Sequence, residues 1–254
     1  MCERELSEAV RIVERREIPA NAKMIHGLPD VGLVGVIAVS QIISQLKMVE
    51  VAYVDSDLIP PIIVLHNGLP HSPIRIFGQD DLLVLISEIA IPAGFLQPLM
   101  RAIVDWMDEK GVETAISLGG IATPNRQNIE SPKVFGAGSN ELSLKILREK
   151  EINIMKRGFL VGSQALILHY CAEKDITAIA LLAQSFYNYP DPEAAAAVIS
   201  ALNQIVKVPV NVSELLEKGE EVRLRMRDIM RRTQSELVRM RKSQEYDIPH
   251  YYVA

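Results

Sequence analysis

Short apolar segments rich in Val and Ile alternate along the chain with longer segments in which apolar residues recur every three or four positions. The first pattern is typical of buried strands and the second of amphipathic helices, so their alternation predicts strands joined by crossover helices. The expected strands are AKMIH, VEVAYVD, IIVLHN, IRIFG, LLVLISE, ETAISLGG, KVFGAG, IMKRGFLV and TAIALLAQ. The expected helices span residues 31–46, 92–110, 139–150, 163–173, 192–206 and 213 to about 245.

Local signals refine the element boundaries and the sheet type. Asp30, Ser139 and Asp191 stand where helix N-caps are expected, and Gly111 follows the end of the helix predicted to start at residue 92. The extended segments IPP and NGLPHSPIRI predict a hairpin around a Gly-Pro turn. A hairpin places antiparallel neighbours in a sheet, so we predict an α/β protein with a mixed, mostly parallel sheet.

The last predicted helix differs from the others. Its apolar residues form a narrow stripe, as expected of a coiled-coil seam or of a helix that lies on a partner, and it is long enough to project. Pro249 cannot continue the helix, so the final residues are predicted to form an extended aromatic tail. We therefore predict an α/β domain, residues 1–211, and a helical extension with its tail, residues 212–254. The stripe consists of Val222, Met226, Ile229, Met230, Thr233, Leu237 and Met240.

Composition and charge exclude several classes of protein. Apolar residues make up 48% of the 254 residues, but no apolar run reaches the length of a membrane span, and the first residues do not resemble a secretory signal. Cys2 and Cys171 are too few for a disulfide framework or a metal site. The net charge of −5 argues against nucleic acid as the main partner, although residues 223–242 carry a local +6 and the rest therefore −11. We expect a cytoplasmic protein with no membrane or nucleic-acid partner, whose basic helix favours contacts between copies or with another acidic surface.

Gly27, Gly32 and Gly35 fall where a strand turns into a helix, which is the position of a phosphate-binding loop. Their spacing, G-x-x-x-x-G-x-x-G, differs from the dinucleotide pattern G-x-G-x-x-G, and apolar residues stand where a mononucleotide loop needs Lys followed by Ser or Thr. The carboxylate of Asp30 would also repel a phosphate at the helix N-terminus, which it is expected to cap. We interpret the three glycines as a tight turn with close helix packing.

A second glycine turn, Gly119 and Gly120, ends another predicted strand in the segment SLGGIATP. Glycine pairs at strand ends serve mostly as packing devices, and we interpret this pair in the same way. Asn125, Arg126 and Gln127 follow it, so they could instead line a crevice for a small molecule.

Residues able to carry acid-base or nucleophilic chemistry are scattered along the chain. None of them belongs to a G-x-S-x-G elbow, an H-E-x-x-H helix or a paired-carboxylate segment. His169 lies in the apolar segment ALILHYCA and is expected to be a hydrogen-bonded core residue. We therefore assign no catalytic, cofactor-binding or metal-binding residue. The candidates considered are His26, His66, His71, His169, Ser87, Ser185, Asp30 and Glu88.

Four segments of this sequence resemble archaeal homologues of the proteasome assembly chaperones. They are GLPDVGLVG, SLGGIATP, LVGSQALILHYCAEKDITAIALLAQS and YNYPDPEAAAAVISALNQIVKVPVNVSELLEKGEEV, spread over residues 27–222. The resemblance implies a three-layer α/β/α sandwich with the shape of nucleoside phosphorylases but without their catalytic set, and it implies oligomers that assist assembly of the proteasome α ring.

Some members of that family insert a C-terminal hydrophobic-Tyr-any tail into pockets between α subunits. This chain departs from the pattern because Val253 takes the penultimate position, after Tyr251 and Tyr252 and before Ala254. These four residues are the candidate docking tail, and the departure makes a complex other than the proteasome an alternative partner.

Residues and resemblance together predict a non-enzymatic, cytoplasmic homo-oligomer that acts as an assembly chaperone or scaffold, without a cofactor. Its expected partners are proteasome α subunits or the subunits of another complex. The alternative is a phosphorylase-like or nucleotide-dependent enzyme or binder that uses the crevice above Gly32, Gly120 and Gly138.

Overall fold

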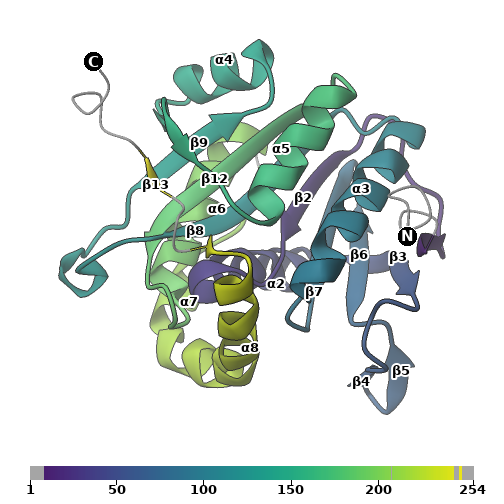
Figure 1. Cartoon of the computed structure of the whole chain (residues 1–254). Coiled ribbons are helices and arrows are strands. Elements are labelled where there is room, and N and C mark those ends of the chain that lie inside the picture. Colours follow the sequence, from purple (N-terminus) through teal and green to yellow (C-terminus); the bar gives the residue numbers. More distant parts are fainter. Residues whose placement is uncertain (1–8, 207, 243–245, 248–254) are drawn as a thin grey trace.

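A nine-stranded mixed sheet forms the centre of the molecule (Figure 1), in the strand order β1-β3-β6-β7-β2-β8-β12-β9-β10. The computed structural model describes residues 9–206, 208–242 and 246–247. Four central strands run parallel, so their carboxyl ends meet at one edge of the sheet. They are β7 (Leu82–Ser87), β2 (Lys23–Gly27), β8 (Thr114–Ala122) and β12 (Thr177–Ser185).

Antiparallel strands flank this parallel core, so the predicted mixed sheet is confirmed. Three of them, β1, β3 and β6, continue the sheet beyond β7, and β9 pairs antiparallel with β12 on the other side. The apolar pattern does not predict β1, because its few apolar residues stand among charged ones. The flanking strands are β1 (Val10–Glu14), β3 (Val49–Ser56), β6 (Ile74–Gln79), β9 (Val134–Gly138) and β10 (Asn153–Ile154).

Helices cover both faces of the sheet, which confirms the α/β/α class. Successive side chains of a strand point to opposite faces, so Ile25 joins one hydrophobic cluster and Met24 the other. Helices α2 and α6 pack on the first face, and α3 and α5 on the second. Their bounds are α2 (Val34–Leu46), α3 (Ala93–Glu109), α5 (Ser163–Glu173) and α6 (Pro192–Val206).

Two predicted helix starts need correction. The helix expected from residue 31 begins as a 3-10 turn, η1 (Val31–Leu33), and bends at Gly32, where φ is 60°, before α2 continues. Helix α4 (Glu141–Glu149) is capped by Asn140 in a capping box, whereas the predicted cap Ser139 donates its hydroxyl to the Ile176 carbonyl. The predicted cap Asp191 does accept the Ala194 amide at 3.0 Å.

The predicted hairpin is present, but it forms a separate two-stranded sheet of β4 (Val64–His66) and β5 (Leu69–His71). Its turn is Asn67–Gly68 rather than Gly-Pro, with φ values of 52° and 80°. Positive φ at both positions suits the tight turns that match strand twist. The hairpin stands away from the body of the molecule (Figure 1).

The segment IMKRGFLV is not one strand, as predicted, but is divided between β10 and β11 (Gly158–Phe159). Strand β10 belongs to the large sheet, whereas β11 lies outside it. Strand β11 pairs antiparallel with β13 (Tyr246–Asp247), which brings the chain beyond the last helix back to the body.

The long C-terminal helix is divided into α7 (Ser213–Glu217) and α8 (Gly219–Arg239). Helix α8 does not project. Met230 and Leu237 of its apolar stripe are buried in the cluster that also contains α2 and α6. The division between residues 211 and 212 remains a prediction, but α8 lies against the α/β body of its own chain (Figure 1).

Candidate protein-interaction surface

The glycines of the first turn lie in close contact with backbone from neighbouring elements. A Cβ atom on Gly27 would lie 2.1 Å from the Gly35 carbonyl oxygen, and one on Gly35 would lie 2.3 Å from the Leu118 carbonyl oxygen. Gly32 combines its positive φ with a Cβ position only 2.0 Å from the Ser185 hydroxyl oxygen. The space that a phosphate would need beside these residues is therefore filled by protein atoms.

The second glycine pair is packed in a similar way. A Cβ atom on Gly119 would lie 2.4 Å from the amide nitrogen of the Gln164 side chain, and one on Gly120 would lie 2.7 Å from the Val31 carbonyl oxygen. Both glycines thus allow α5 and η1 to approach the end of β8.

Helix α8 and the residues after it occupy the carboxyl edge of the parallel strands. Lys242, 1% exposed, forms an ion pair with Asp30 at 3.0 Å and a hydrogen bond to the Gln164 side-chain oxygen at 3.2 Å. Asp30 was expected to cap the helix, but it makes no side-chain cap bond because its carboxylate turns toward Lys242. Glu236 of α8 accepts a hydrogen bond from the Ala93 backbone amide at 2.9 Å, and so caps the N-terminus of α3.

The cavity left beside the loop after β2 is very small. It lies between the loop after β2, the starts of α3 and α5, and α8, and its volume is about 10 Å³. One water molecule needs about 10 to 15 Å³. In open α/β sheets, ligands bind outside the carboxyl ends of the strands, and here α8 takes that place.

Arg126 and Asp191 close the next part of the same edge. The guanidinium binds both carboxylate oxygens at 2.9 and 3.0 Å, and Arg126 and Asp191 are 2% and 0% exposed. Arg126 also contacts Glu193 and the Ile129 carbonyl oxygen. It is a structural residue of this edge, with its donors already used, rather than a group that faces a crevice.

Three of the considered catalytic residues are buried at strand ends. Burial lowers the pKa of His26 to about 4, and neither ring nitrogen has a hydrogen-bond partner among the described residues. Ser87 and Ser185 donate to the nearby Ile89 and Phe186 carbonyl oxygens. Within the described residues, no hydrogen bond joins a serine hydroxyl to a histidine, so the geometry assembles no nucleophile and base there.

The remaining histidines lie elsewhere. His169, expected in the core, has a 64% exposed side chain on α5 beside Glu173, so that prediction is wrong. The other two stand at the base of the β4–β5 hairpin. His66 lies beside Glu88, and His71 lies 3.1 Å from Glu50.

Arg75 links both sides of that base. Its side chain is 7% exposed and forms ion pairs with Glu50 and Glu88. One guanidinium nitrogen also lies 2.7 Å from the His66 ring nitrogen. These contacts fix the hairpin to β3, β6 and the end of β7, and they give His66, His71 and Glu88 a structural role at an arm that leaves the body.

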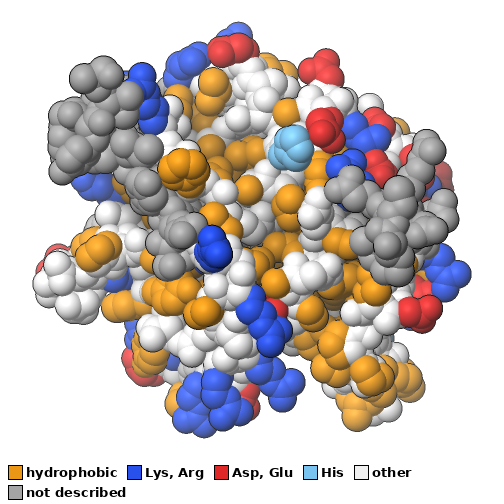
Figure 2. All heavy atoms as spheres, in the orientation of Figure 1, with side chains coloured by type: hydrophobic (Ala, Val, Ile, Leu, Met, Phe, Trp, Pro, Cys, Tyr) orange, Lys and Arg blue, Asp and Glu red, His pale blue; other side chains and the backbone are white. Residues whose placement is uncertain are grey.

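The hairpin presents aliphatic side chains to solvent. Ile63, Leu65 and Leu69 are each 63 to 64% exposed, and Ile62 is 37% exposed. Figure 2 shows hydrophobic side chains gathered on this projecting arm at the lower right. Contiguous exposed apolar surface marks sites of interaction with other proteins, so the arm is the strongest candidate interaction surface in the described chain.

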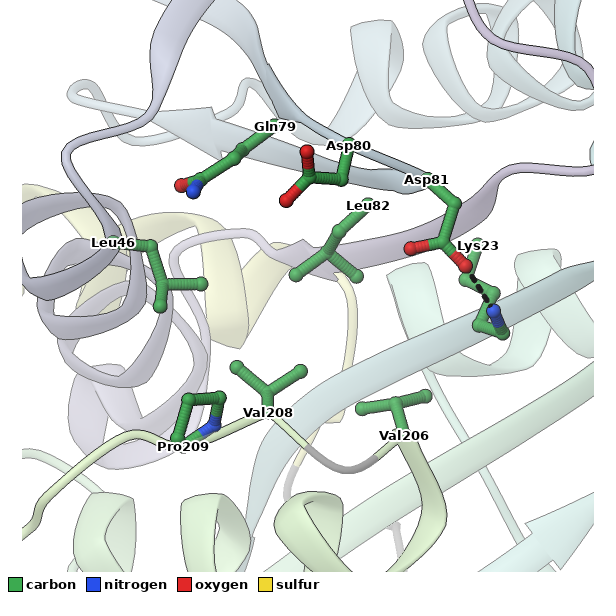
Figure 3. A pocket seen from close by; sticks show the side chains of 9 residues that line it. All are labelled: Lys23, Leu46, Gln79, Asp80, Asp81, Leu82, Val206, Val208 and Pro209. Carbon is green, nitrogen blue, oxygen red and sulfur yellow. Dashed lines mark hydrogen bonds and ion pairs between the residues drawn. The ribbon is translucent and has the colours of Figure 1, made fainter.

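A second hollow lies at the opposite edge of the sheet (Figure 3). Its volume is about 230 Å³, below the 300 to 1,000 Å³ typical of small-molecule pockets. Lys23 on its rim is held by Asp81, and Asp80 adds a second carboxylate beside apolar lining from the ends of α2 and α6. Two carboxylates against one lysine do not favour a phosphate-bearing ligand.

Across residues 9–206, 208–242 and 246–247, no three His, Cys, Asp or Glu side chains are grouped to hold a metal ion. No described helix is long and apolar enough to cross a membrane. The predicted docking tail, Tyr251, Tyr252, Val253 and Ala254, lies outside the described residues.

Sequence reasoning missed the residues that close the carboxyl edge and those that expose the arm. Lys242 and Glu236 act on partners far away along the chain, and no local pattern connects them to Asp30 or to the start of α3. The aliphatic residues of the hairpin resemble a buried strand by composition. Only Asn67–Gly68 marked a turn that could have placed them on an arm.

Comparison with known proteins places these features in a family. The structure resembles Pyrococcus furiosus PbaA, described as an archaeal homolog of proteasome-assembly chaperone, with a TM-score of 0.83 and 30% identity over 89% of this chain and 98% of that one. It also resembles P. furiosus PbaB, an archaeal proteasome activator, with a TM-score of 0.73 and 23% identity, over 87% of this chain and 98% of PbaB. An uncharacterized protein of Methanocaldococcus jannaschii is 29% identical over 87% of this chain and 91% of its own length. Residues 24–230 match the model of the PAC2 family, and the chain therefore belongs to that family.

Proposed function

We propose that this chain is a non-enzymatic assembly chaperone or scaffold that works in the cytoplasm as a homo-oligomer. The observation that carries the proposal is the occupied carboxyl edge. Helix α8 and Lys242 fill the place beside the loop after β2 where an enzyme of this architecture binds its ligand, and the cavity that remains there is about 10 Å³. No specific observation favours the phosphorylase-like or nucleotide-dependent alternative.

The proposed partners are proteasome α subunits. The similarity to PbaA supports this choice, because that protein is described as a homolog of proteasome-assembly chaperone and matches most of this chain. The similarity to PbaB supports only the fold. The subunits of another complex are the second candidate, since Val253 departs from the expected tail pattern.

A second copy of the chain is the proposed occupant of the β4–β5 arm. The arm is held at its base by Arg75, Glu50 and Glu88, so it enters an interface with little loss of conformational freedom. Its exposed surface is aliphatic, whereas salt bridges and charged side chains cover much of the body. Burial of such side chains between copies is a strong driving force for association.

The test follows the assembly of purified archaeal α subunits into rings by light scattering, with and without this chain. We expect this chain, at a concentration equal to or below that of the α subunits, to change the rate or yield of ring formation. Calorimetric titration with ATP, NAD and inosine is the parallel arm for the alternative. A micromolar Kd for one of these ligands together with no effect on α subunits would overturn the proposal, because that affinity corresponds to about −8 kcal/mol.

The tail contributes a separate prediction. If Tyr251 to Ala254 dock on α subunits, Val253→Tyr restores the hydrophobic-Tyr-any order, and one added aromatic anchor strengthens binding by about tenfold for a single tail. Surface binding to an α ring compares wild type, Val253→Tyr and a chain ending at Pro249. Equal, negligible signal from all three would remove tail docking from the proposed function and favour the subunits of another complex as the partner.

A further inference from the structure

Helix α8 and the loop after β12 enclose a hollow of about 230 Å³ whose lining is basic and apolar together. One wall is α8, from Glu220 to Gln234, and the other is the loop Asn188–Pro190. Buried Met230 belongs to the lining, while Leu224 and Tyr189, 68% and 48% exposed, stand at the surface. Its volume suits a side chain rather than a drug-sized ligand. We call this hollow the α8 groove.

The walls of the α8 groove are fixed before any partner arrives. Gln234 donates to the Asn188 carbonyl oxygen at 3.0 Å and so ties the loop to α8. The Tyr189 ring lies edge-on to Phe186, with ring centroids 5.9 Å apart, and the guanidinium of Arg223 lies 5.8 Å from the Tyr189 ring centroid. A preformed site loses less conformational entropy on binding than one that must be ordered.

Two arginines of the α8 groove have no acidic partner among the described residues. Arg223 is paired with Glu193 and Glu220. Arg227 and Arg231 are exposed and stand on one face of α8, one turn apart, with no ion pair within the described chain. Figure 2 shows Lys and Arg side chains gathered over this part of the molecule, below the centre. The groove therefore offers unused cationic donors beside an apolar floor.

We propose that the α8 groove binds an extended acidic peptide segment of a partner protein, with carboxylates at alternate positions and an apolar side chain two residues before or after them. Residues four apart on a helix are displaced by about 6 Å along its axis. Residues two apart on an extended strand are displaced by about 6.6 Å and point the same way. A segment with Asp or Glu at alternate positions thus matches Arg227 and Arg231, and its apolar residue meets Leu224 and Tyr189.

Protein is favoured over nucleic acid as the occupant. Nucleic-acid binding that is driven by counterion release needs several phosphate contacts along a basic stripe. Among the described residues, the lining of the α8 groove has two unpaired arginines, and it also contains Glu220. The whole chain also carries a net charge of −5. The inference goes beyond the proposed function, and its test uses no proteasome component, so either can fail while the other stands.

The test measures fluorescence anisotropy of a labelled peptide that contains Leu-Ser-Glu-Ser-Glu, in which the two glutamates alternate and the leucine points the same way, titrated with the full chain at about 0.15 M salt. A peptide of the same composition with its two glutamates in one block, Leu-Ser-Ser-Glu-Glu, is the ligand control. We expect the double variant Arg227→Glu/Arg231→Glu to weaken binding of the alternating peptide by about tenfold or more, since charge-assisted hydrogen bonds become repulsions. Arg232→Glu, on the same helix but outside the groove lining, changes the net charge by half as much as the double variant; it is the charge control and should change the Kd by less than about twofold.

Thermal melting first establishes that both variants fold, which is expected because all three arginines are exposed. The inference is overturned if the wild-type chain does not bind the alternating peptide, if the block peptide binds equally well, or if Arg232→Glu weakens binding as much as the double variant does. Displacement of the peptide by a single-stranded oligonucleotide of equal charge at equal concentration would assign the groove to nucleic acid instead.

Discussion

Gly32 shows how one residue sets the entrance to α2. Its φ of 60° is in the left-handed region, and a Cβ atom there would lie 2.0 Å from the Ser185 hydroxyl oxygen. We expect Gly32→Ala to lower the free energy of unfolding by about 2 kcal/mol or more, from backbone strain and the clash with Ser185. Chemical denaturation measures the change. Gly94→Ala is the matched control, because open space surrounds Gly94 and alanine favours the helix. Equal effects of the two substitutions would contradict the packing role.

His26 makes stability depend on pH in a defined direction. Burial lowers its pKa from 6.5 to about 4, so between these values the unfolded chain binds the proton and the folded chain does not. Above pH 6.5 His26 is neutral in both states and does not reduce the free energy of unfolding. As the pH falls toward 4, the free energy of unfolding decreases by about 3 kcal/mol in total.

Replacement by an apolar residue removes that dependence. As the pH falls from 7 to 4, we expect wild type to lose up to about 3 kcal/mol more unfolding free energy than His26→Leu loses. His169→Leu, at an exposed position, is the control and should show little such shift. A constant difference across the pH range for His26→Leu would show that the buried imidazole is not the titrating group.

At the scale of elements, the ion pair of Asp30 and Lys242 fastens the end of the C-terminal helical segment to the loop after β2. Both side chains are at most 5% exposed. Lys242→Met leaves the carboxylate buried without its ion-pair partner, so we expect a loss of about 3 to 5 kcal/mol in unfolding free energy. Arg241→Met, one residue earlier and exposed, should change stability little.

A double-mutant cycle separates the pair from the packing of Lys242 alone. Asp30→Asn removes the buried charge with little change in shape, so Asp30→Asn/Lys242→Met should be more stable than Lys242→Met. Additive losses in the cycle would mean that the two residues do not act together in solution.

The elements differ in how far the sequence predicts them. Helices α5 and α6 have the predicted bounds, and the cap predicted for α6, Asp191, is present. The break at Lys218 was missed although Gly219 follows it. The contacts of Lys242 with Asp30 and Gln164 could not be predicted, because tertiary packing alone brings these residues together.

The interaction surfaces were predicted less well than the fold. The glycine segments were interpreted as tight turns because their spacing does not match a phosphate-binding loop. The closed carboxyl edge is consistent with that interpretation. Exposure of Leu65 and Leu69 has no sequence signal, because alternating aliphatic residues resemble a buried strand until the arm is seen to leave the body.

At the scale of the whole molecule, the arm predicts the state of association. Burial of one leucine side chain is worth about 1.5 to 3 kcal/mol, so Leu65→Ser/Leu69→Ser should weaken self-association by about a hundredfold or more. Light scattering over a dilution series measures this shift toward smaller species. Val238→Ser, which removes an equally exposed aliphatic residue from α8, is the control. An unchanged dissociation midpoint for the double variant would exclude the arm as the interface between copies.

The chain as a whole combines a carboxyl edge closed by α8 beside the loop after β2 with two exposed surfaces, the β4–β5 arm and the α8 groove, which we propose bind protein. Native mass spectrometry of the chain mixed with archaeal proteasome α subunits, ATP, NAD and inosine tests both parts in one measurement. We expect ions of a complex between oligomers of this chain and α subunits, and no ligand adducts on this chain. Ligand adducts on the chain without any complex would contradict the account and favour the enzyme alternative.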